Sequence, residues 1–516
     1  MTEVAALLAS PIAALAALGG TLLVVPVLLP LAGLLLALAF GGRHAARIAR
    51  TAITLGMLAA VPIAAAVLEA GAPLRYDLGG WAPPLGVALQ ADGLSAVMLL
   101  TSAVILFGVG IYAAPGYRIP AGVAETRGAL AFWTLLLGVW GGLNLVFLGQ
   151  DLFTLYVALE LLTFSAVPLV CLEGRAETLA AALRYLLFAL LGSVLYLLGT
   201  ALLYGAYGTL DIAGLAGHLA GEPRLPPAAL AAATLMTVGL LAKTALFPLH
   251  LWLPPAHAGA PPAASAVLSA LVVKGSFFLI LRLWFDVMPG LLALGAAEIL
   301  GALGAVAIVY GGLLALAQVR LKLLVAYSTL AQLGYLFLVF PLAAAPAANA
   351  PVILTGGMLQ LVSHACAKAA MFLAAGLIAK ALGADRIGGL HGIARALPLT
   401  VLAFGIGGLA LVGIPPSGAY LAKTFLEGAA LATGQAAWGL AMQVGGLLTA
   451  AYLIRVFFHA LSGFGRPPAL VSRPALAQEL VVLGLALGAL FLGLLPPDIL
   501  ALMEIGRPGS AAGGLP

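Results

Sequence analysis

Charged side chains are scarce in this sequence, and their scarcity excludes an ordinary soluble protein. Only 8% of the 516 residues are Asp, Glu, Lys or Arg, 63% are hydrophobic, and the mean hydropathy is +1.17. Soluble proteins carry about 25% charged residues. Because a fold of this size in water needs a polar surface, its apolar residues cannot all be buried in a core. The sequence therefore predicts a protein whose surroundings are mainly lipid.

Cysteine is almost absent as well. Cys171 and Cys366 lie in or beside apolar runs, and there is no C-x-x-C pair, which leaves no basis for a disulfide framework, a zinc site or an iron–sulfur cluster. No glycine-rich loop follows a strand, and no long polar segment is available to hold a nucleotide. Basic residues are scattered among loops, so nucleic-acid binding is not expected. We expect no cofactor and no metal.

Long apolar runs are what the sequence does contain. Fourteen segments approach the ~20 residues with which a helix spans a bilayer. They are 21–41, 51–70, 93–114, 128–148, 152–172, 180–206, 226–247, 263–286, 291–315, 323–343, 352–379, 397–426, 434–460 and 477–500. Strict alternation is absent, so these segments are not strands of an outer-membrane barrel. The expected fold is an all-α polytopic membrane protein with about 14 transmembrane helices.

The residues before the first span are apolar too. Segment 4–20 is interrupted by Pro11 and by the glycine pair at 19–20, and it is either an interfacial segment or an extra span. It has no basic residues at its start and no clean cleavage site before Arg43. We therefore expect it to be structural rather than a signal peptide.

The distribution of basic residues between the loops tests the number of spans. Cytoplasmic loops of membrane proteins carry an excess of Lys and Arg. When loops are taken alternately, one set holds 13 basic residues and the other, including the C-terminal tail, holds 3. A miscounted span would scramble this asymmetry. We therefore place both termini outside and the basic loops in the cytoplasm.

Two predicted spans contain helix-breaking sequences. Span 226–247 ends in LFPLH and is followed by further prolines, and span 397–426 contains GIPPSG at 413–418. Proline removes a backbone donor and clashes with the preceding turn. Broken backbone at membrane depth survives only inside protein or beside a water-filled cavity. Because the two spans are five apart and run in opposite directions, they predict an inverted repeat with an ion site at its interface.

Lysine is unevenly placed. The chain has six lysines against seventeen arginines, yet Lys243, Lys274, Lys368 and Lys423 all lie inside predicted spans. A charge at the centre of a membrane helix costs about 2.5–3.5 kcal/mol on insertion scales. Burial brings the pKa of a lysine towards neutrality, whereas arginine does not release its proton. The four buried lysines therefore indicate proton transfer.

One carboxylate matches these lysines. Glu160 lies in the middle of span 152–172 with apolar residues on both sides. Pairing with Lys243 would keep both groups ionised, and opening that pair would change both proton affinities. The pair is therefore a candidate switch.

Histidines extend the candidate set. His364 and Lys368 are four residues apart and share one helix face. His250 follows the first break, and its imidazole titrates near neutral pH, so it is an accessory candidate. His250 and His257 are interpreted equally well as loop histidines without a function.

A series of motifs carries a resemblance to a known family. They are 151–160 (DLFTLYVALE), 243–254 (KTALFPLHLWLP), 260–274, 327–334 (YSTLAQLG), Ser363 and His364 with Lys368, 413–418 leading to Lys423, and 78–81 (LGGW) with Asp92. Over roughly residues 20–500 the chain resembles the antiporter-like membrane subunits shared by respiratory complex I, membrane-bound hydrogenases and Mrp-type cation/proton antiporters. In length it is similar to the medium-sized members, such as the Mrp D-type subunit.

The resemblance implies an organisation. Residues 1–127 would be N-terminal helices, 128–286 and 291–460 two inverted five-helix repeats that each form a half-channel, and 461–516 a C-terminal helix and tail. The partners would be other membrane subunits of one complex, the lipid bilayer, and H⁺, with Na⁺ or K⁺ in an antiporter. The place would be the inner membrane of a bacterium.

The resemblance also implies residue roles. Glu160 and Lys243 would be the charged pair of the first half-channel, and Lys274 the central connecting residue. His364 and Lys368 would continue the axis, and Lys423 would face the other half-channel. A proton from the cytoplasm would load Lys274 through Lys243 and leave past His364, Lys368 and Lys423.

Three functions remain open at this point. The chain is interpreted first as a proton-translocating subunit of a redox pump related to NADH:quinone oxidoreductase. The alternatives are an Mrp-type Na⁺ or K⁺/H⁺ antiporter subunit and a membrane anchor that does not conduct; pairing with a soluble partner for inorganic carbon uptake has little support. Because the chain offers no redox centre, the driving change would come from a partner.

Overall fold

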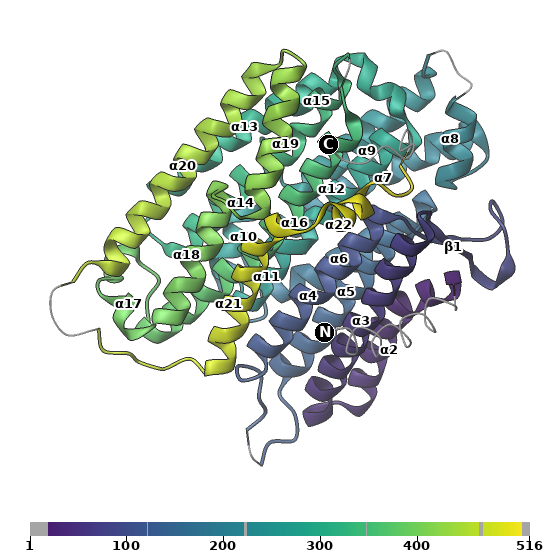
Figure 1. The fold of residues 1–516 in the computed structure, drawn as a ribbon. Coiled ribbons are helices and arrows are strands. Elements are labelled where there is room, and N and C mark those ends of the chain that lie inside the picture. Colours follow the sequence, from purple (N-terminus) through teal and green to yellow (C-terminus); the bar gives the residue numbers. More distant parts are fainter. Residues whose placement is uncertain (1–18, 121, 221–223, 347, 464–467, 508–516) are drawn as a thin grey trace, which may run out of the picture.

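The protein is a bundle of long helices, described here from a computed structural model (Figure 1). The structure describes residues 19–120, 122–220, 224–346, 348–463 and 468–507. Within these residues, 13 helices are long and apolar enough to cross a membrane. The remaining predicted span, 397–426, consists of the two shorter helices Pro398–Val412 and Gly418–Ala432 on either side of a break, so the all-α polytopic fold is confirmed. The predicted segment 4–20 lies almost wholly outside the described residues.

The elements follow the chain in three groups. The N-terminal part contains η1 (Gly19–Leu23), α2 (Val24–Phe40), α3 (Gly42–Ala70), β1 (Leu74–Asp77), η2 (Leu78–Gly80), β2 (Ala88–Ala91) and α4 (Gly93–Ala113). The next contains α5 (Arg127–Leu148), α6 (Leu152–Val170), α7 (Ala176–Tyr207), α8 (Ile212–Ala220), α9 (Pro227–Thr244), α10 (Leu253–Gly259), α11 (Pro262–Val267), η3 (Leu268–Val272), α12 (Val273–Leu281), η4 (Arg282–Val287) and η5 (Pro289–Leu294). Within it, η3 and η4 are π-helical turns.

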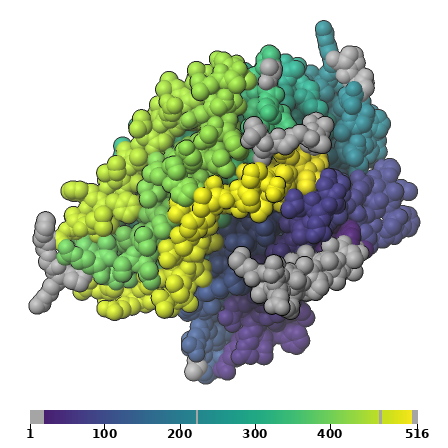
Figure 2. Space-filling view, in the orientation of Figure 1, coloured from purple at the N-terminus to yellow at the C-terminus, as the bar shows by residue number. Residues whose placement is uncertain are grey.

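The last group completes the bundle. It contains α13 (Ala296–Ala317), α14 (Leu321–Phe337), α15 (Val339–Ala344), α16 (Ala350–Leu382), η6 (Ile387–Gly389), α17 (Ile393–Ala396), α18 (Pro398–Val412), α19 (Gly418–Ala432), α20 (Ala436–Leu461), α21 (Leu476–Phe491), η7 (Leu492–Leu494), α22 (Pro497–Ala501) and η8 (Leu502–Glu504). Residues 492–507, which follow α21, cross the visible face between the later helices and the N-terminal helices (Figure 2).

Both predicted helix breaks are present, and they have the same geometry. Ala245 follows α9 with φ +61°, and Gly413 follows α18 with φ +88°. At each break the amide of the next residue bonds five residues back, to the carbonyl of Leu241 (3.2 Å) or Leu409 (3.3 Å). This pattern ends a helix by satisfying its last carbonyls. Each break is followed by a second short helix, α10 or α19.

A second paired feature relates the two halves. Asp151 before α6 forms an isolated antiparallel bridge with Asp211, and Arg320 before α14 forms the same bridge with Arg386. Because five spans, an odd number, separate equivalent helices, the equivalent helices run in opposite directions. The acidic bridge and the basic bridge therefore lie at opposite ends of the bundle, which agrees with the loop-charge asymmetry.

Two boundaries and one element differ from the prediction. The second span was expected at 51–70, but α3 begins at Gly42 because the Arg/Ala-rich segment before residue 51 contains no helix breaker. The ninth was expected at 291–315, and α13 begins at Ala296 after the turn η5. The antiparallel pair β1–β2 was not predicted, since strands of four residues carry almost no periodic signal.

The most enclosed helices lie at the centre. In the most apolar 18 residues of α16, every residue is buried, and the same holds for the continuous stretch from α11 to η4. In α20 only a third of the corresponding residues are buried. Side chains on α16 and α12 are therefore surrounded by protein rather than lipid. These are the helices that carry Lys274, His364 and Lys368.

Candidate functional site: a buried row of lysines

Glu160 on α6 and Lys243 on α9 form an ion pair, as the sequence predicts. The Lys243 Nζ lies 3.6 Å from the Glu160 Oε1, and the two side chains are only 5% and 16% exposed, Lys243 being the more buried. Each group also has a hydroxyl partner: Lys243 donates to the Thr163 Oγ1 at 2.9 Å, and Ser193 on α7 donates to the Glu160 Oε1. Each charged group is therefore stabilised by a hydroxyl as well as by its ion-pair partner.

Glycines bring α7 and α9 close enough to build this pair. A Cβ at Gly192 would lie 2.5 Å from the Gly239 carbonyl oxygen and 3.0 Å from the Lys243 side chain. A Cβ at Gly239 would in turn lie 2.4 Å from the Gly192 carbonyl oxygen. No larger residue fits at either position without moving a helix. The hydroxyl of Ser193, next in the chain, is thereby placed on Glu160.

Lys274 occupies the centre of the bundle and is fully buried. Its Nζ donates to the Ser269 carbonyl oxygen at 2.6 Å. Ser269 belongs to the π-helical turn η3, and such turns leave carbonyls without their usual helical partner. The Ser269 hydroxyl also lies 2.9 Å from the Thr329 hydroxyl on α14. The helix irregularity therefore creates the acceptor for this lysine and connects it to α14.

Lys368 on α16 reaches the same helix α14 and is also fully buried. It donates to the Val325 carbonyl oxygen at 3.0 Å and to the Ser328 hydroxyl. Thr329 donates to that same Val325 oxygen at 3.0 Å. A continuous set of hydrogen-bonded groups thus joins Lys274 to Lys368 through the residues of η3 and α14.

Two histidines lie beside these central lysines. His364 and His257 are both fully buried, and neither ring nitrogen of either has a hydrogen-bond partner within the described residues. Both rings lie within electrostatic range of Lys274 and Lys368. His257, which the sequence left open as a loop histidine or a functional one, belongs to the short helix α10 and stacks on Phe372. In the sequence, only its position directly after the broken segment indicated that this histidine could belong to the site.

Lys423 lies on α19, past the second break. Its Nζ donates to the Val412 carbonyl oxygen at 2.7 Å, which is a carbonyl freed by the end of α18, and lies 4.8 Å from the centre of the Tyr335 ring. Glu427 follows one turn later and lies within electrostatic range. Glu427 was not predicted, although its spacing of four residues from Lys423 places both on one helix face.

His250 stands apart from the lysine row. It packs between the rings of Phe247 and Tyr310, at 5.6 and 5.3 Å between ring centres. With Arg184 and Tyr327 it lines a cavity of about 360 Å³. The structure does not bring His250 into contact with any of the four buried lysines.

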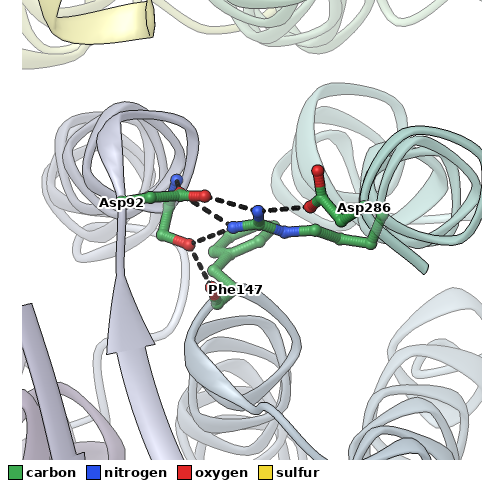
Figure 3. Close-up of polar contacts among 5 residues, drawn as sticks. Asp92, Phe147 and Asp286 are labelled. Carbon is green, nitrogen blue, oxygen red and sulfur yellow. Dashed lines mark hydrogen bonds and ion pairs between the residues drawn. The ribbon is translucent and has the colours of Figure 1, made fainter. Parts of the chain in front are cut away.

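A buried ionic cluster at one end of α12 was not assigned from the sequence (Figure 3). Arg282 bonds both carboxylate oxygens of Asp92, the Asp286 carboxylate at 2.7 Å and the Ser95 hydroxyl at 2.9 Å. Burial by itself raises the pKa of Asp92, but the Arg282 guanidinium outweighs burial and holds that pKa below its usual range. Arg507 lies within electrostatic range of Asp92 and Asp286.

The predicted residues therefore form three clusters rather than one chain of contacts. Glu160 and Lys243 form the first, Lys274 and Lys368 with two histidines the second, and Lys423 with Glu427 the third. Among the described residues, no direct hydrogen bond or ion pair joins one cluster to the next. No group of three or more His, Cys, Asp or Glu side chains suited to a metal occurs in that part of the chain.

Comparison with known proteins agrees with this architecture. Residues 149–449 match the family described as NADH:quinone oxidoreductase/Mrp antiporter, transmembrane. Over 427 residues the chain is 34% identical to NADH-quinone oxidoreductase subunit N of Desulforudis audaxviator, and the match covers 82% of this chain and 83% of that protein. It is 27% identical to the D-type subunit of the Na⁺/H⁺ antiporter of Bacillus subtilis, over 75% of this chain and 76% of that one.

The fold is similar to that of a solved antiporter complex. A chain of the Mrp complex from Dietzia sp. DQ12-45-1b superposes with a TM-score of 0.84 at 26% identity, covering 94% of this chain and 96% of that one. The region matched by the family contains both helix breaks and all four buried lysines. The chain belongs to the NADH:quinone oxidoreductase/Mrp antiporter family of membrane subunits.

Proposed function

We propose that this chain conducts protons across the membrane as one subunit of a multisubunit complex. The observation that carries this proposal is the burial of Lys274 and Lys368 on one hydrogen-bonded set of groups at the centre of the bundle. Charged groups in membrane helices are rare and mark ion pathways. A membrane anchor that conducts nothing has no use for four buried lysines, each of which makes insertion into the membrane less favourable.

The proposed path starts at the cytoplasmic end. A cavity of about 700 Å³ lies there, lined by the end of α10 and by Lys322, Glu173 and Asp385. Lys322 at its edge donates to the Ala260 carbonyl oxygen, next to α10. The buried His257 on α10 lies within electrostatic range of Lys322, Lys274 and Lys368. This arrangement supports proton uptake beside the first broken span, as the sequence predicts.

Glu160 and Lys243 act as the switch of this path. At 3.6 Å the carboxylate favours the charged form of the lysine, and moving it away makes release of the proton easier. The proton then moves by way of Lys274, His364 and Lys368 to Lys423. Water molecules connect the three clusters, since no protein group bridges them in the described residues.

We propose that each five-helix repeat forms one half-channel. The units are 128–286 and 291–460, flanked by the N-terminal helices 1–127 and the C-terminal part 461–516. The matched breaks after α9 and α18 support this division. The protein would lie in the inner membrane of a bacterium, with other membrane subunits and lipid around it.

A redox pump is the first candidate for the complex. The higher sequence identity, 34%, is with a subunit of an NADH-quinone oxidoreductase, against 27% with an Na⁺/H⁺ antiporter subunit. A second candidate is an Mrp-type Na⁺ or K⁺/H⁺ antiporter, which is supported by the TM-score of 0.84 with a chain of an Mrp complex.

One experiment separates these candidates. Inverted vesicles containing the complete complex are given a pH gradient by an independent respiratory chain, and Na⁺ or K⁺ is then added. Collapse of the gradient by the cation identifies an antiporter. Acidification of the vesicle interior by an electron donor of the complex, without a cation effect, identifies a redox pump.

Variants of Lys243 test the proton path in either case. Lys243→Ala should abolish transport, and Lys243→Arg should do the same because guanidinium keeps the charge but does not release the proton. Arg473→Ala, which removes an exposed cation instead, should transport normally. Full transport by both Lys243 variants in a correctly assembled complex would disprove the proposed path.

A further inference from the structure

Four arginines gather on one surface at the cytoplasmic end of α3. Arg43, Arg47 and Arg50 follow one another at spacings of four and three, so they share one face of the helix, and Arg118 approaches from the segment after α4. All four are exposed, and they line one cavity of about 830 Å³. In the described part of the chain, none of them is within 4.0 Å of an acidic side chain.

This arrangement is electrostatically unfavourable in the isolated chain. Four like charges around one cavity repel one another, whereas the positive end of the helix dipole is already compensated by the Glu125 carboxylate, which accepts a hydrogen bond from the Gly42 amide at 2.8 Å. Arginine forms paired hydrogen bonds with phosphate, so a phosphate group would relieve the repulsion among the arginines. The cavity therefore fits a ligand with more than one negative charge.

The same helix face continues as an apolar surface. Thr54, Leu58 and Val61 extend the line of Arg43, Arg47 and Arg50 at spacings of four and three, and Leu58 is 59% and Val61 41% exposed. A second cavity of about 410 Å³, lined by Arg47, Arg50, Thr51, Thr54 and Leu55, lies where the two kinds of surface meet. Cations, then hydroxyls, then aliphatic side chains follow in the order of a phospholipid headgroup, glycerol and acyl chain.

We propose that this surface, the arginine face of α3, binds an anionic phospholipid of the cytoplasmic leaflet. Basic pockets beside membrane helices on this side of the bilayer are suited to anionic headgroups. The number of unpaired cations favours a headgroup with two phosphates, of the diphosphatidylglycerol class, over phosphatidylglycerol. The inference is independent of proton conduction, because none of these residues belongs to the lysine row.

Native mass spectrometry of the full-length chain in detergent tests this site. The purified chain is titrated with phosphatidylcholine, phosphatidylglycerol and diphosphatidylglycerol. Arg47→Gln/Arg50→Gln is compared with Arg386→Gln/Arg473→Gln, a matched loss of two exposed basic charges in other loops of the same side. We expect diphosphatidylglycerol to bind most tightly, and its affinity to fall at least about tenfold in the first double variant only, since that variant removes two of the four cations that would contact the headgroup.

Further comparisons test whether the surface binds the whole lipid rather than a free phosphate compound, any anion or a partner protein. Glycerol 1,3-bisphosphate, the free headgroup of diphosphatidylglycerol, should not displace the bound lipid if the apolar part of the face contributes; displacement by it would overturn the proposal of a lipid site. Equal loss of lipid from both double variants would show an unspecific charge effect and overturn the proposal. It would also be overturned if Arg47→Gln/Arg50→Gln left the lipid content of the complete complex unchanged but released a partner subunit, because the face would then bind protein.

Discussion

At the scale of single residues, the Glu160–Lys243 pair has the features of a switch. The two charged groups are 3.6 Å apart, which is beyond hydrogen-bond distance. Each has its own hydroxyl partner, Thr163 for Lys243 and Ser193 for Glu160. Separation of the charges therefore leaves each with a polar partner. A pair without such partners would leave an uncompensated buried charge on opening, at about 3–5 kcal/mol. The hydroxyls thus lower the free energy needed to open the pair.

The contact between Ser269 and Thr329 makes a prediction about the central cluster. Thr329→Val keeps the shape of the side chain but removes the only described hydroxyl link between η3 and α14 near Lys274. We expect transport to fall by about tenfold and stability by about 1–3 kcal/mol, because the Ser269 hydroxyl loses a buried partner. Vesicle transport assays and thermal unfolding in detergent measure the two effects.

Thr355→Val is the matched control for this prediction. Thr355 is also fully buried, on α16, but its hydroxyl has no hydrogen-bond partner among the described groups. Its replacement should leave transport near the normal level. If both threonine variants transport alike, the hydroxyl of Thr329 has no part in conduction.

The sequence predicted that Lys243, Lys274, Lys368 and Lys423 are buried, because a charge inside an apolar run is visible without a structure, and their roles in conduction stay predictions. It assigned Glu160 and Lys243 as a pair, which the structure confirms by distance. It left the position of His257 open, because the four prolines around this residue indicated a loop, whereas the backbone continues there as the short helix α10. Glu427 was missed although its spacing of four residues from Lys423 on α19 places both on one helix face.

At the scale of helices, close packing of α7 on α9 is what places Lys243. This contact predicts that Gly192→Ala separates the two helices, since the added Cβ would lie 2.5 Å from the Gly239 carbonyl oxygen. We expect a loss of stability of about 1–3 kcal/mol, typical of overpacking, and a loss of transport as Lys243 moves away from Glu160. Thermal unfolding and vesicle transport check both.

The same helix contains a matched control. Gly205 lies on α7 with nothing within 4 Å of an added Cβ. Gly205→Ala should keep transport intact and stabilise the helix by up to about 1 kcal/mol, because alanine is the better helix former. Equal stability of the two variants would contradict the inference that the α7–α9 contact has no room for a methyl group.

Helix breaks were predictable and helix boundaries less so. Proline and glycine act locally, so the breaks after α9 and α18 can be predicted from neighbouring residues alone. The start of α3 cannot, because arginine is a good helix former whether it lies in lipid or in water. Charge was therefore a wrong guide to where the helix α3 begins.

At the scale of the whole molecule, one ionic cluster joins distant parts of the chain. Asp92 precedes α4, Arg282 and Asp286 follow α12, and the C-terminal segment accepts a hydrogen bond at its Ile505 carbonyl from the Gly93 amide at 3.0 Å. Residues 190 positions apart in the sequence meet in this cluster. Such a separation is why the cluster was not predicted: no local pattern indicates which arginine meets which carboxylate.

This cluster makes the last prediction. Arg282→Gln removes the cation that Asp92 and Asp286 share in a buried position, with Arg282 only 9% and Asp92 1% exposed at the side chain. Two carboxylates would then face each other without their shared cation, which should lower the free energy of unfolding by about 3–5 kcal/mol. Arg175→Gln is the control, because its ion pair with Glu173 is 73% and 41% exposed and such pairs contribute about 0–1 kcal/mol. Thermal unfolding in detergent should therefore separate the two variants clearly. Similar unfolding temperatures would mean that the buried Arg282 cluster contributes no more to stability than an exposed ion pair does.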